Sequence, residues 1–91
     1  MIPYTNAEIV ESLMKAKDWN YVNECLEKQF LFEDFNQALG FILKVGILAE
    51  KQNHHPEINN VYNKVTLRIY THDANGITDK DFKLANSIDK L

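Results

Sequence analysis

The clearest strand pattern in this 91-residue chain is INNVYNKVTLRIYT, residues 58–71. Val65, Leu67 and Ile69 alternate there with polar neighbours, which is typical of a half-buried antiparallel strand. The Asn63-Lys64 pair just before them is short enough to turn a hairpin, and asparagine tolerates a positive φ. We therefore predict a hairpin whose second strand turns one face to the core.

Capping signatures mark the starts of three helices. Thr5 to Glu8 and Thr78 to Asp81 are capping boxes, and Asp34 with Gln37 is a looser version of the same motif. We expect the first helix to end near Asp18. The apolar stripes that we expect to face the core are Val10, Leu13 and Met14 in the first helix, Phe35, Ala38, Leu39, Ile42, Val45 and Ala49 in the second, and Phe82, Ala85 and Ile88 in the third.

Residues 19–32, between the first two helices, suggest two short strands, of which Phe30-Leu31-Phe32 is the clearest part. The element order is then α-β-β-α-β-β-α. Helices on one face of a four-stranded antiparallel sheet give an α+β, two-layer sandwich. We expect one domain over residues 1–91, with Trp19 and Tyr62 in the core or in the wall of a pocket.

The second helix is more apolar than one buried face requires, because it also carries Phe41, Leu43, Ile47 and Leu48. Two interpretations remain open. The helix is either covered by its neighbours within the domain, or part of its surface or the sheet edge is buried against another subunit.

Composition excludes several classes of protein. A net charge of -3 argues against binding along a nucleic-acid backbone, which normally needs a basic face. No apolar run approaches the roughly 20 residues that cross a bilayer, and no signal-peptide pattern opens the chain. The single cysteine, Cys25, excludes an internal disulfide and favours a reducing compartment. We expect a cytoplasmic protein.

All three histidines lie within residues 50–81, as the adjacent pair His54-His55 and as His72. Pro56 extends the backbone at His55, so the side chains of the pair should point to opposite sides. Three functions fit: acid–base catalysis, a metal site that uses His54 and His72 with nearby carboxylates, or a protein-interaction scaffold whose histidines are incidental. The metal site has no familiar zinc spacing to support it.

A wider spacing distinguishes these alternatives. In order, the pattern reads Glu50, three residues, His54-His55-Pro56, five residues, Tyr62, nine residues, His72, eight residues and Asp81. This pattern resembles the signature of the pterin-4a-carbinolamine dehydratases. The flanking segments 30–35, 60–65 and 76–78 are also similar to that family. The resemblance covers nearly the whole chain, from about Thr5 to Leu91.

The resemblance implies dehydration of 4a-hydroxytetrahydropterin to quinonoid dihydropterin, without a cofactor or metal, in tetrahydropterin recycling. It implies that His54 and His72 are the acid–base pair and that His55 positions the pterin and contributes to the rate. The substrate-binding residues that it implies are Glu50, His54, His55, Pro56, Thr71, His72, Asp73 and Ala74. Glu50 could orient His54 from one helical turn away, or could be a solvated carboxylate at the helix end. Asp81 is expected to support the loop under His72, and we expect none of the three histidines to fill the core.

Family members associate as dimers or tetramers, which fits an apolar second helix. Animal members also bind a homeodomain transcription factor, and nothing in this sequence speaks for that role. The alternative to catalysis is therefore a non-catalytic, oligomeric dimerisation module. One departure from the family pattern is Asn53, where aspartate is common, so the rate or the pH optimum should differ.

Overall fold

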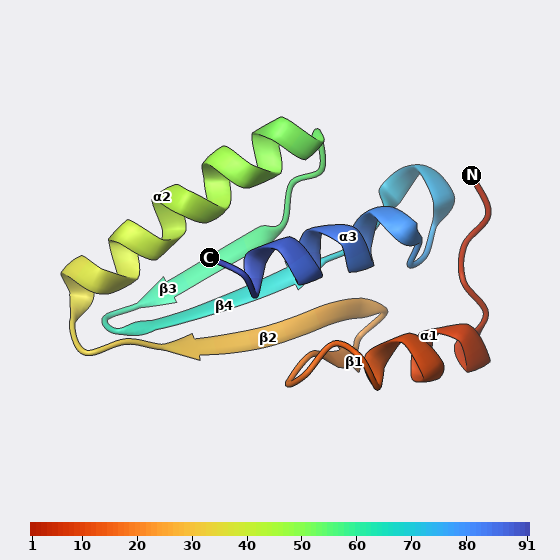
Figure 1. The fold of residues 1–91 in the computed structure, drawn as a ribbon, viewed down its shortest axis with the longest axis horizontal. Coiled ribbons are helices and arrows are strands. Elements are labelled where there is room, and N and C mark those ends of the chain that lie inside the picture. The colour runs from red at the N-terminus through yellow and green to blue at the C-terminus, as the bar shows by residue number, and fades with distance from the viewer.

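The elements follow one another in the predicted order in the computed structural model, which describes residues 1–91 (Figure 1). A 3-10 turn, η1, is the one addition. The elements are α1 (Asn6–Leu13), β1 (Asn20–Val22), β2 (Cys25–Leu31), α2 (Phe35–Gln52), β3 (Glu57–Val61), β4 (Lys64–Ile69), η1 (His72–Ala74) and α3 (Asp79–Ile88).

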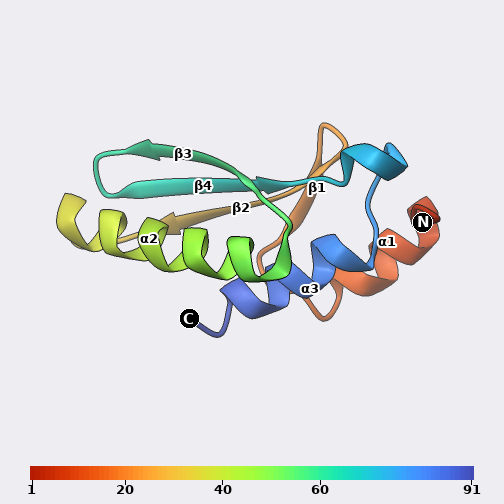
Figure 2. The same ribbon diagram turned by 90° about the horizontal axis from the view of Figure 1, so that it is seen from above.

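The four strands form one antiparallel sheet in the order β1-β2-β4-β3. The long central pair β2 and β4 is in register from Leu26 opposite Ile69 to Leu31 opposite Lys64. All three helices lie on the same face of this sheet, so the molecule has two layers (Figure 2). The predicted fold class is confirmed.

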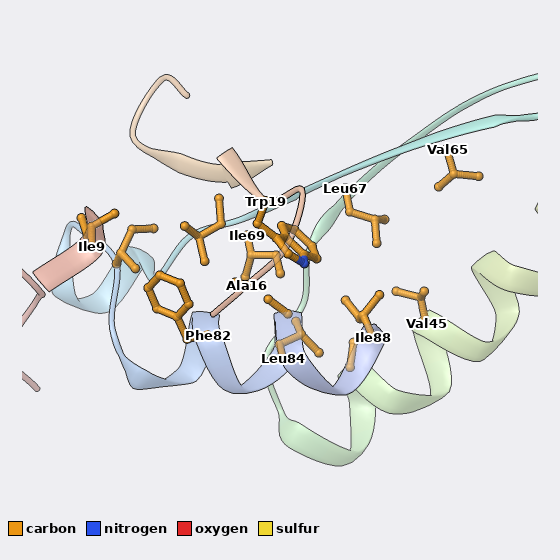
Figure 3. Close-up of a cluster of buried hydrophobic side chains, with 14 of the residues drawn as sticks. Ile9, Ala16, Trp19, Val45, Val65, Leu67, Ile69, Phe82, Leu84 and Ile88 are labelled. Atoms are coloured by element: carbon orange, nitrogen blue, oxygen red, sulfur yellow. The ribbon is translucent and has the colours of Figure 1, made fainter. Parts of the chain in front are cut away.

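The core lies between the sheet and the helices (Figure 3). Val65, Leu67 and Ile69 have no exposed surface, as the alternation along β4 predicted. Opposite them lie the buried residues of α3, and Trp19 belongs to the same cluster. Each large apolar side chain buried in this way stabilises the fold by about 1.5–3 kcal/mol.

The second helix begins where its cap predicts, but it buries a different stripe. The Asp34 carboxylate accepts the amide of Gln37 at 2.8 Å. Only Ala38, Val45 and Ala49 are fully buried. A second, outward stripe repeats every four residues and remains exposed: Phe35, Leu39, Leu43 and Ile47. The expectation that Phe35 and Leu39 face the core was wrong, because α2 turns only its small residues and Val45 fully toward the sheet and α3.

The first helix is shorter than predicted. It ends at Leu13, and a turn follows that places Asp18 at φ 66°. Ile9 is its buried residue, whereas Val10 and Met14 are exposed. The predicted stripe was therefore right at Leu13 and wrong at Val10 and Met14, because the short helix rests on the core through the face that carries Ile9 and Leu13.

The hairpin loops use left-handed backbone at residues other than glycine. Asn23 and Glu24 join β1 to β2 with φ of 49° and 67°. In the loop from β3 to β4 the positive φ is at Tyr62, at 50°, and not at Asn63 as expected. Tyr62 is exposed at this loop and belongs neither to the core nor to a pocket wall, because the turn directs it to solvent.

No helix of the structure is both long enough and apolar enough to cross a membrane.

Candidate active site

The position of His54 is set by the way α2 ends. Asn53 caps the helix in the left-handed conformation, with φ 50° and ψ 42°. Asparagine adopts this conformation more readily than most residues, which gives it a structural role at this position. The amide of His54 then donates back to Ala49 at 3.0 Å. The chain therefore leaves α2 with His54 directed inward.

The partner of His54 is the carboxylate of Asp81, which is fully buried in the first turn of α3. His54 Nε2 lies 2.6 Å from Asp81 Oδ1. Asp81 Oδ2 accepts the hydroxyl of Thr71 at 2.6 Å and the backbone amide of Thr78 at 2.8 Å. Thr71 Oγ1 in turn lies 2.9 Å from Thr78 Oγ1. A single side chain thus connects the end of β4, the start of α3 and the residue that follows α2.

These contacts fix the proton on His54. An ionised carboxylate accepts hydrogen bonds only, so Nε2 of His54 must be the nitrogen that donates to Asp81. In the neutral ring Nδ1 then keeps its lone pair free, as in other carboxylate–histidine pairs. The role expected for Asp81, support of the loop under His72, is therefore incomplete, because Asp81 also holds His54.

His55 has different surroundings. Its Nε2 lies 2.7 Å from Glu50 Oε1, and the two side chains are 57% and 80% exposed. The expectation that Glu50 could orient His54 was wrong. The left-handed Asn53 sends His54 inward and leaves His55 on the solvent side, where Glu50 can reach it. The two adjacent histidines therefore have different hydrogen-bond partners, Asp81 for His54 and Glu50 for His55.

His72 lies on a short closed loop after β4. Thr71 and Gly76 form an isolated antiparallel bridge across it. Within the bridge, the amide of Ala74 donates to Thr71 at 3.2 Å and the amide of Asn75 donates to His72 at 3.1 Å. The His72 ring packs edge-on against Tyr70, with ring centroids 5.0 Å apart. His72 is thus mounted on an ordered turn and remains exposed.

All three histidines line one polar cavity of about 280 Å³. That volume is near the lower end of the range for small-molecule sites. The complete lining is Asn53, His54, His55, Tyr70, Thr71, His72, Asp73 and Lys80. Five of the residues expected at the site are therefore brought together there, namely His54, His55, Thr71, His72 and Asp73.

Three expected substrate-binding residues lie outside this lining. Pro56 and Ala74 are half-buried beside it, and Glu50 reaches it only through His55. Sequence reasoning missed Asn53, Tyr70 and Lys80. Lys80 directly precedes Asp81 in the capping box. The sequence therefore already placed Lys80 in the first turn of the third helix, next to a residue that was expected to support the site.

A larger groove of about 620 Å³ lies elsewhere, along α2 and β3. It is lined mainly by apolar side chains, including Ile42, Leu43, Ile47 and Ile58. It holds no histidine, so its surface suits packing rather than proton transfer. No three His, Cys, Asp or Glu side chains of the chain are grouped so that they could hold a metal ion.

Comparison with known proteins identifies relatives of this chain. The family model described as pterin 4 alpha carbinolamine dehydratase matches residues 2–91. A "Putative pterin-4-alpha-carbinolamine dehydratase" of Sulfurisphaera tokodaii is 48% identical over 96% of this chain and 94% of its own length. A protein of the same name from Solibacter usitatus is 45% identical over 96% and 92%.

A solved structure is also similar. A crystal structure of a transcriptional coactivator/pterin dehydratase from Brucella melitensis superposes with a TM-score of 0.92 at 37% identity, over 97% of this chain and 96% of that one. The family model alone spans nearly the whole chain. The chain therefore belongs to the pterin-4-alpha-carbinolamine dehydratase family.

The buried network makes a prediction about Asp81→Asn. An amide offers only one acceptor oxygen to three donors, so at least one donor loses its partner. We expect a loss of about 2–4 kcal/mol in the free energy of unfolding, measured by urea denaturation. We also expect ¹⁵N NMR of the His54 ring to show the proton fixed on Nε2 in the unaltered protein and no longer fixed there in the variant.

The matched control is Asp18→Asn, an exposed change at a left-handed position that asparagine accepts. It should alter the free energy of unfolding by less than about 0.5 kcal/mol. Equal stability of the two variants would mean that the Asp81 network is not formed in solution.

Proposed function

We propose that this protein dehydrates a 4a-hydroxytetrahydropterin to the quinonoid dihydropterin, as a step in tetrahydropterin recycling. The observation that carries the proposal is the gathering of all three histidines around one small polar cavity in a member of this family. A cytoplasmic, cofactor-free enzyme is part of the same proposal.

The reaction is an elimination across the C4a–N5 bond of the pterin. The C4a–O bond breaks and its electron pair leaves with the hydroxyl, which takes up a proton to become water. The N5 lone pair forms the new C4a=N5 double bond, and N5 loses its proton. One proton is donated and one is accepted, so the protein needs one acid and one base within reach of neighbouring atoms.

The tautomer of His54 supports the role of base. Because Asp81 holds the proton on Nε2, Nδ1 is the nitrogen able to accept the N5 proton. The imidazolium that forms would be stabilised by the Asp81 carboxylate. His72, which lines the same cavity and is exposed, is the proposed donor to the leaving hydroxyl.

His55 has the remaining role, which is to position the ring. Glu50 holds its Nε2 from the solvent side, so its ring is oriented before substrate arrives. Thr71, Asp73 and Lys80 supply the other polar groups of the lining that can contact the pterin amide edge. Among these, Lys80 is the one cation.

The first prediction of the proposal concerns the histidines. The purified protein should accelerate loss of the carbinolamine absorbance when a pterin-dependent hydroxylase supplies the intermediate. His54→Gln and His72→Ala should each lower kcat by roughly 10- to 10³-fold, the usual contribution of a general acid or base. The double variant should approach the uncatalysed rate, whereas His55→Ala should raise KM at least as much as it lowers kcat.

Glutamine is chosen at position 54 because the His54 side chain is buried, whereas we had expected none of the histidines to fill the core. His54 is only 9% exposed, and alanine would leave the buried Asp81 carboxylate without one of its donors. Glutamine can still donate an N–H to Asp81 but cannot transfer a proton. A folded double variant with the original kcat would end the histidine mechanism and favour the alternative, a non-catalytic interaction module.

The second prediction concerns metals. The proposed elimination needs only proton transfer, since the N5 lone pair helps to expel the hydroxyl. Exhaustive chelation followed by assay in metal-free buffer should leave kcat unchanged. A large loss of rate that added zinc reverses would instead support a metal site.

The third prediction concerns assembly, for which we propose a homo-oligomer that buries the outward stripe of α2. Its four apolar side chains are 44–65% exposed, and the apolar groove of about 620 Å³ lies beside them. Large contiguous apolar surfaces of this kind usually mark interfaces. Sedimentation at micromolar concentration should give at least twice the 10.6 kDa mass of one chain.

Leu43→Lys combined with Ile47→Lys should shift the protein to the monomer, because charges would be buried at the contact. Val10→Lys on α1 is the control, since Val10 is also exposed but lies away from this stripe. A monomeric unaltered protein, or equal dissociation by the control, would argue against this interface.

A further inference from the structure

Two residues ahead of α1, Pro3 and Tyr4, lie against the loop that carries His72; we call them the Pro3–Tyr4 strap. The amide of Tyr4 donates to the carbonyl of Ile77 at 2.6 Å. The ring of Tyr4 stacks on the ring of Phe82, with centroids 5.6 Å apart and an angle of 19° between the planes. Both ribbon views show the N-terminal end of the chain at the same end of the molecule as η1 and the start of α3 (Figures 1 and 2).

The Tyr4 hydroxyl adds a long-range contact. It donates to Oδ1 of Asp79, 75 positions along the chain, in the first turn of α3. This hydrogen bond, with burial and the charge of Asp79, raises the pKa of Tyr4 to about 12. The Tyr4 hydroxyl therefore keeps the proton that it donates up to about pH 10, and the bond is lost as the pH rises through 12.

Pro3 contacts the loop at Gly76. A Cβ at Gly76 would lie 2.9 Å from Pro3 Cβ, which is closer than side chains normally approach. Glycine is thus required there by the close approach of the strap, and not by its backbone angles. Gly76 is also the residue that closes the His72 loop through its bridge to Thr71.

The loop of residues 71–78 is therefore held from two sides. On the inner side, Thr71 and Thr78 bond to each other and to Asp81, the partner of His54. On the other side, Pro3 packs on Gly76 and Tyr4 binds Ile77 and Asp79. The inner contacts fix the ends of the loop, whereas the strap fixes the residues that lead from η1 into α3.

We propose that the Pro3–Tyr4 strap holds His72 in its working position, and that Tyr4 is a positioning residue for the dehydration. The kinetic part of this inference rests on the proposed function. Tyr4 does not line the histidine cavity, so its effect on the reaction must pass through the residues that it contacts, in the loop and in the first turns of α3.

The test compares Tyr4→Phe, which loses only the hydroxyl, with Tyr4→Ala, which also loses the stack on Phe82. Tyr21→Phe is the control, because Tyr21 is an exposed tyrosine on β1. We expect Tyr4→Ala to lower kcat by roughly 10-fold, within the range for displaced catalytic groups. Tyr4→Phe should have a smaller effect and the control none.

A double-mutant cycle separates positioning from general loss of stability. If the strap acts through His72, Tyr4→Ala should change kcat far less in a His72→Ala background, because the group that it positions is already gone. A full 10-fold loss in that background would overturn the proposal.

Amide hydrogen exchange tests the strap without any assay of activity. The amides of Ala74, Asn75 and Gly76 should exchange faster in Tyr4→Ala, while those of the β2–β4 ladder keep their rates. Unchanged loop exchange would refute the strap even if the enzyme is active. Faster loop exchange in a protein without dehydratase activity would instead refute the proposed function and leave the strap standing.

An ultraviolet titration checks the hydroxyl contact itself. One of the four tyrosines should ionise near pH 12 in the unaltered protein. That transition should be absent in Tyr4→Phe and should move back toward pH 10 in Asp79→Asn. Its persistence in Tyr4→Phe would show that another tyrosine is responsible and would remove the Tyr4–Asp79 bond from the argument.

Discussion

The buried carboxylate of Asp81 is the group on which the rest of the site depends. Removing a charge from water costs several kcal/mol unless donors replace the lost hydration. Here the donors come from three places: His54 after α2, Thr71 after β4 and Thr78 before α3. Because each donor is needed, the three elements cannot move independently. The cavity wall is thus fixed by the same network that stabilises the fold.

This arrangement gives the three histidines unequal exposure. His54 is buried against a charged partner, whereas His55 and His72 are exposed at the rim of the cavity. A ligand that enters the cavity would meet one buried ring held by Asp81 and two exposed rings, of which His55 is held by Glu50 and His72 by its closed turn. The proposed elimination needs a proton donor and a proton acceptor at neighbouring atoms, and three rings held around one small cavity suit that need.

Local patterns in the sequence predicted most of the fold. The alternation of Val65, Leu67 and Ile69 and the caps at Thr5, Asp34 and Thr78 depend on neighbours a few residues away, and all appear in the structure. The buried stripes of α1 and α2 were less predictable. When a helix has apolar residues on several sides, its sequence pattern does not determine which side packs against the sheet.

The spacing of the histidines predicted which residues share the cavity, but not how they are paired. A separation of four residues favoured a Glu50–His54 contact, yet the left-handed turn at Asn53 rotates His54 away and gives Glu50 to His55. The contact of His54 with Asp81, 27 residues away, depends on where α3 packs. Lys80 was missed for the same reason, since its place at the cavity follows from tertiary packing.

The left-handed turns have a consequence for the resilience of this protein. Six residues other than glycine have a positive φ, and the three glycines have none. Asparagine and aspartate tolerate that conformation, but Glu24 and Tyr62 carry a steric penalty on the order of 1–2 kcal/mol each. Glycine at those two loops would exchange that penalty for a smaller loss of chain entropy. Glycine substitutions at the two hairpin loops should therefore raise the thermal stability of the protein without altering any residue of the cavity.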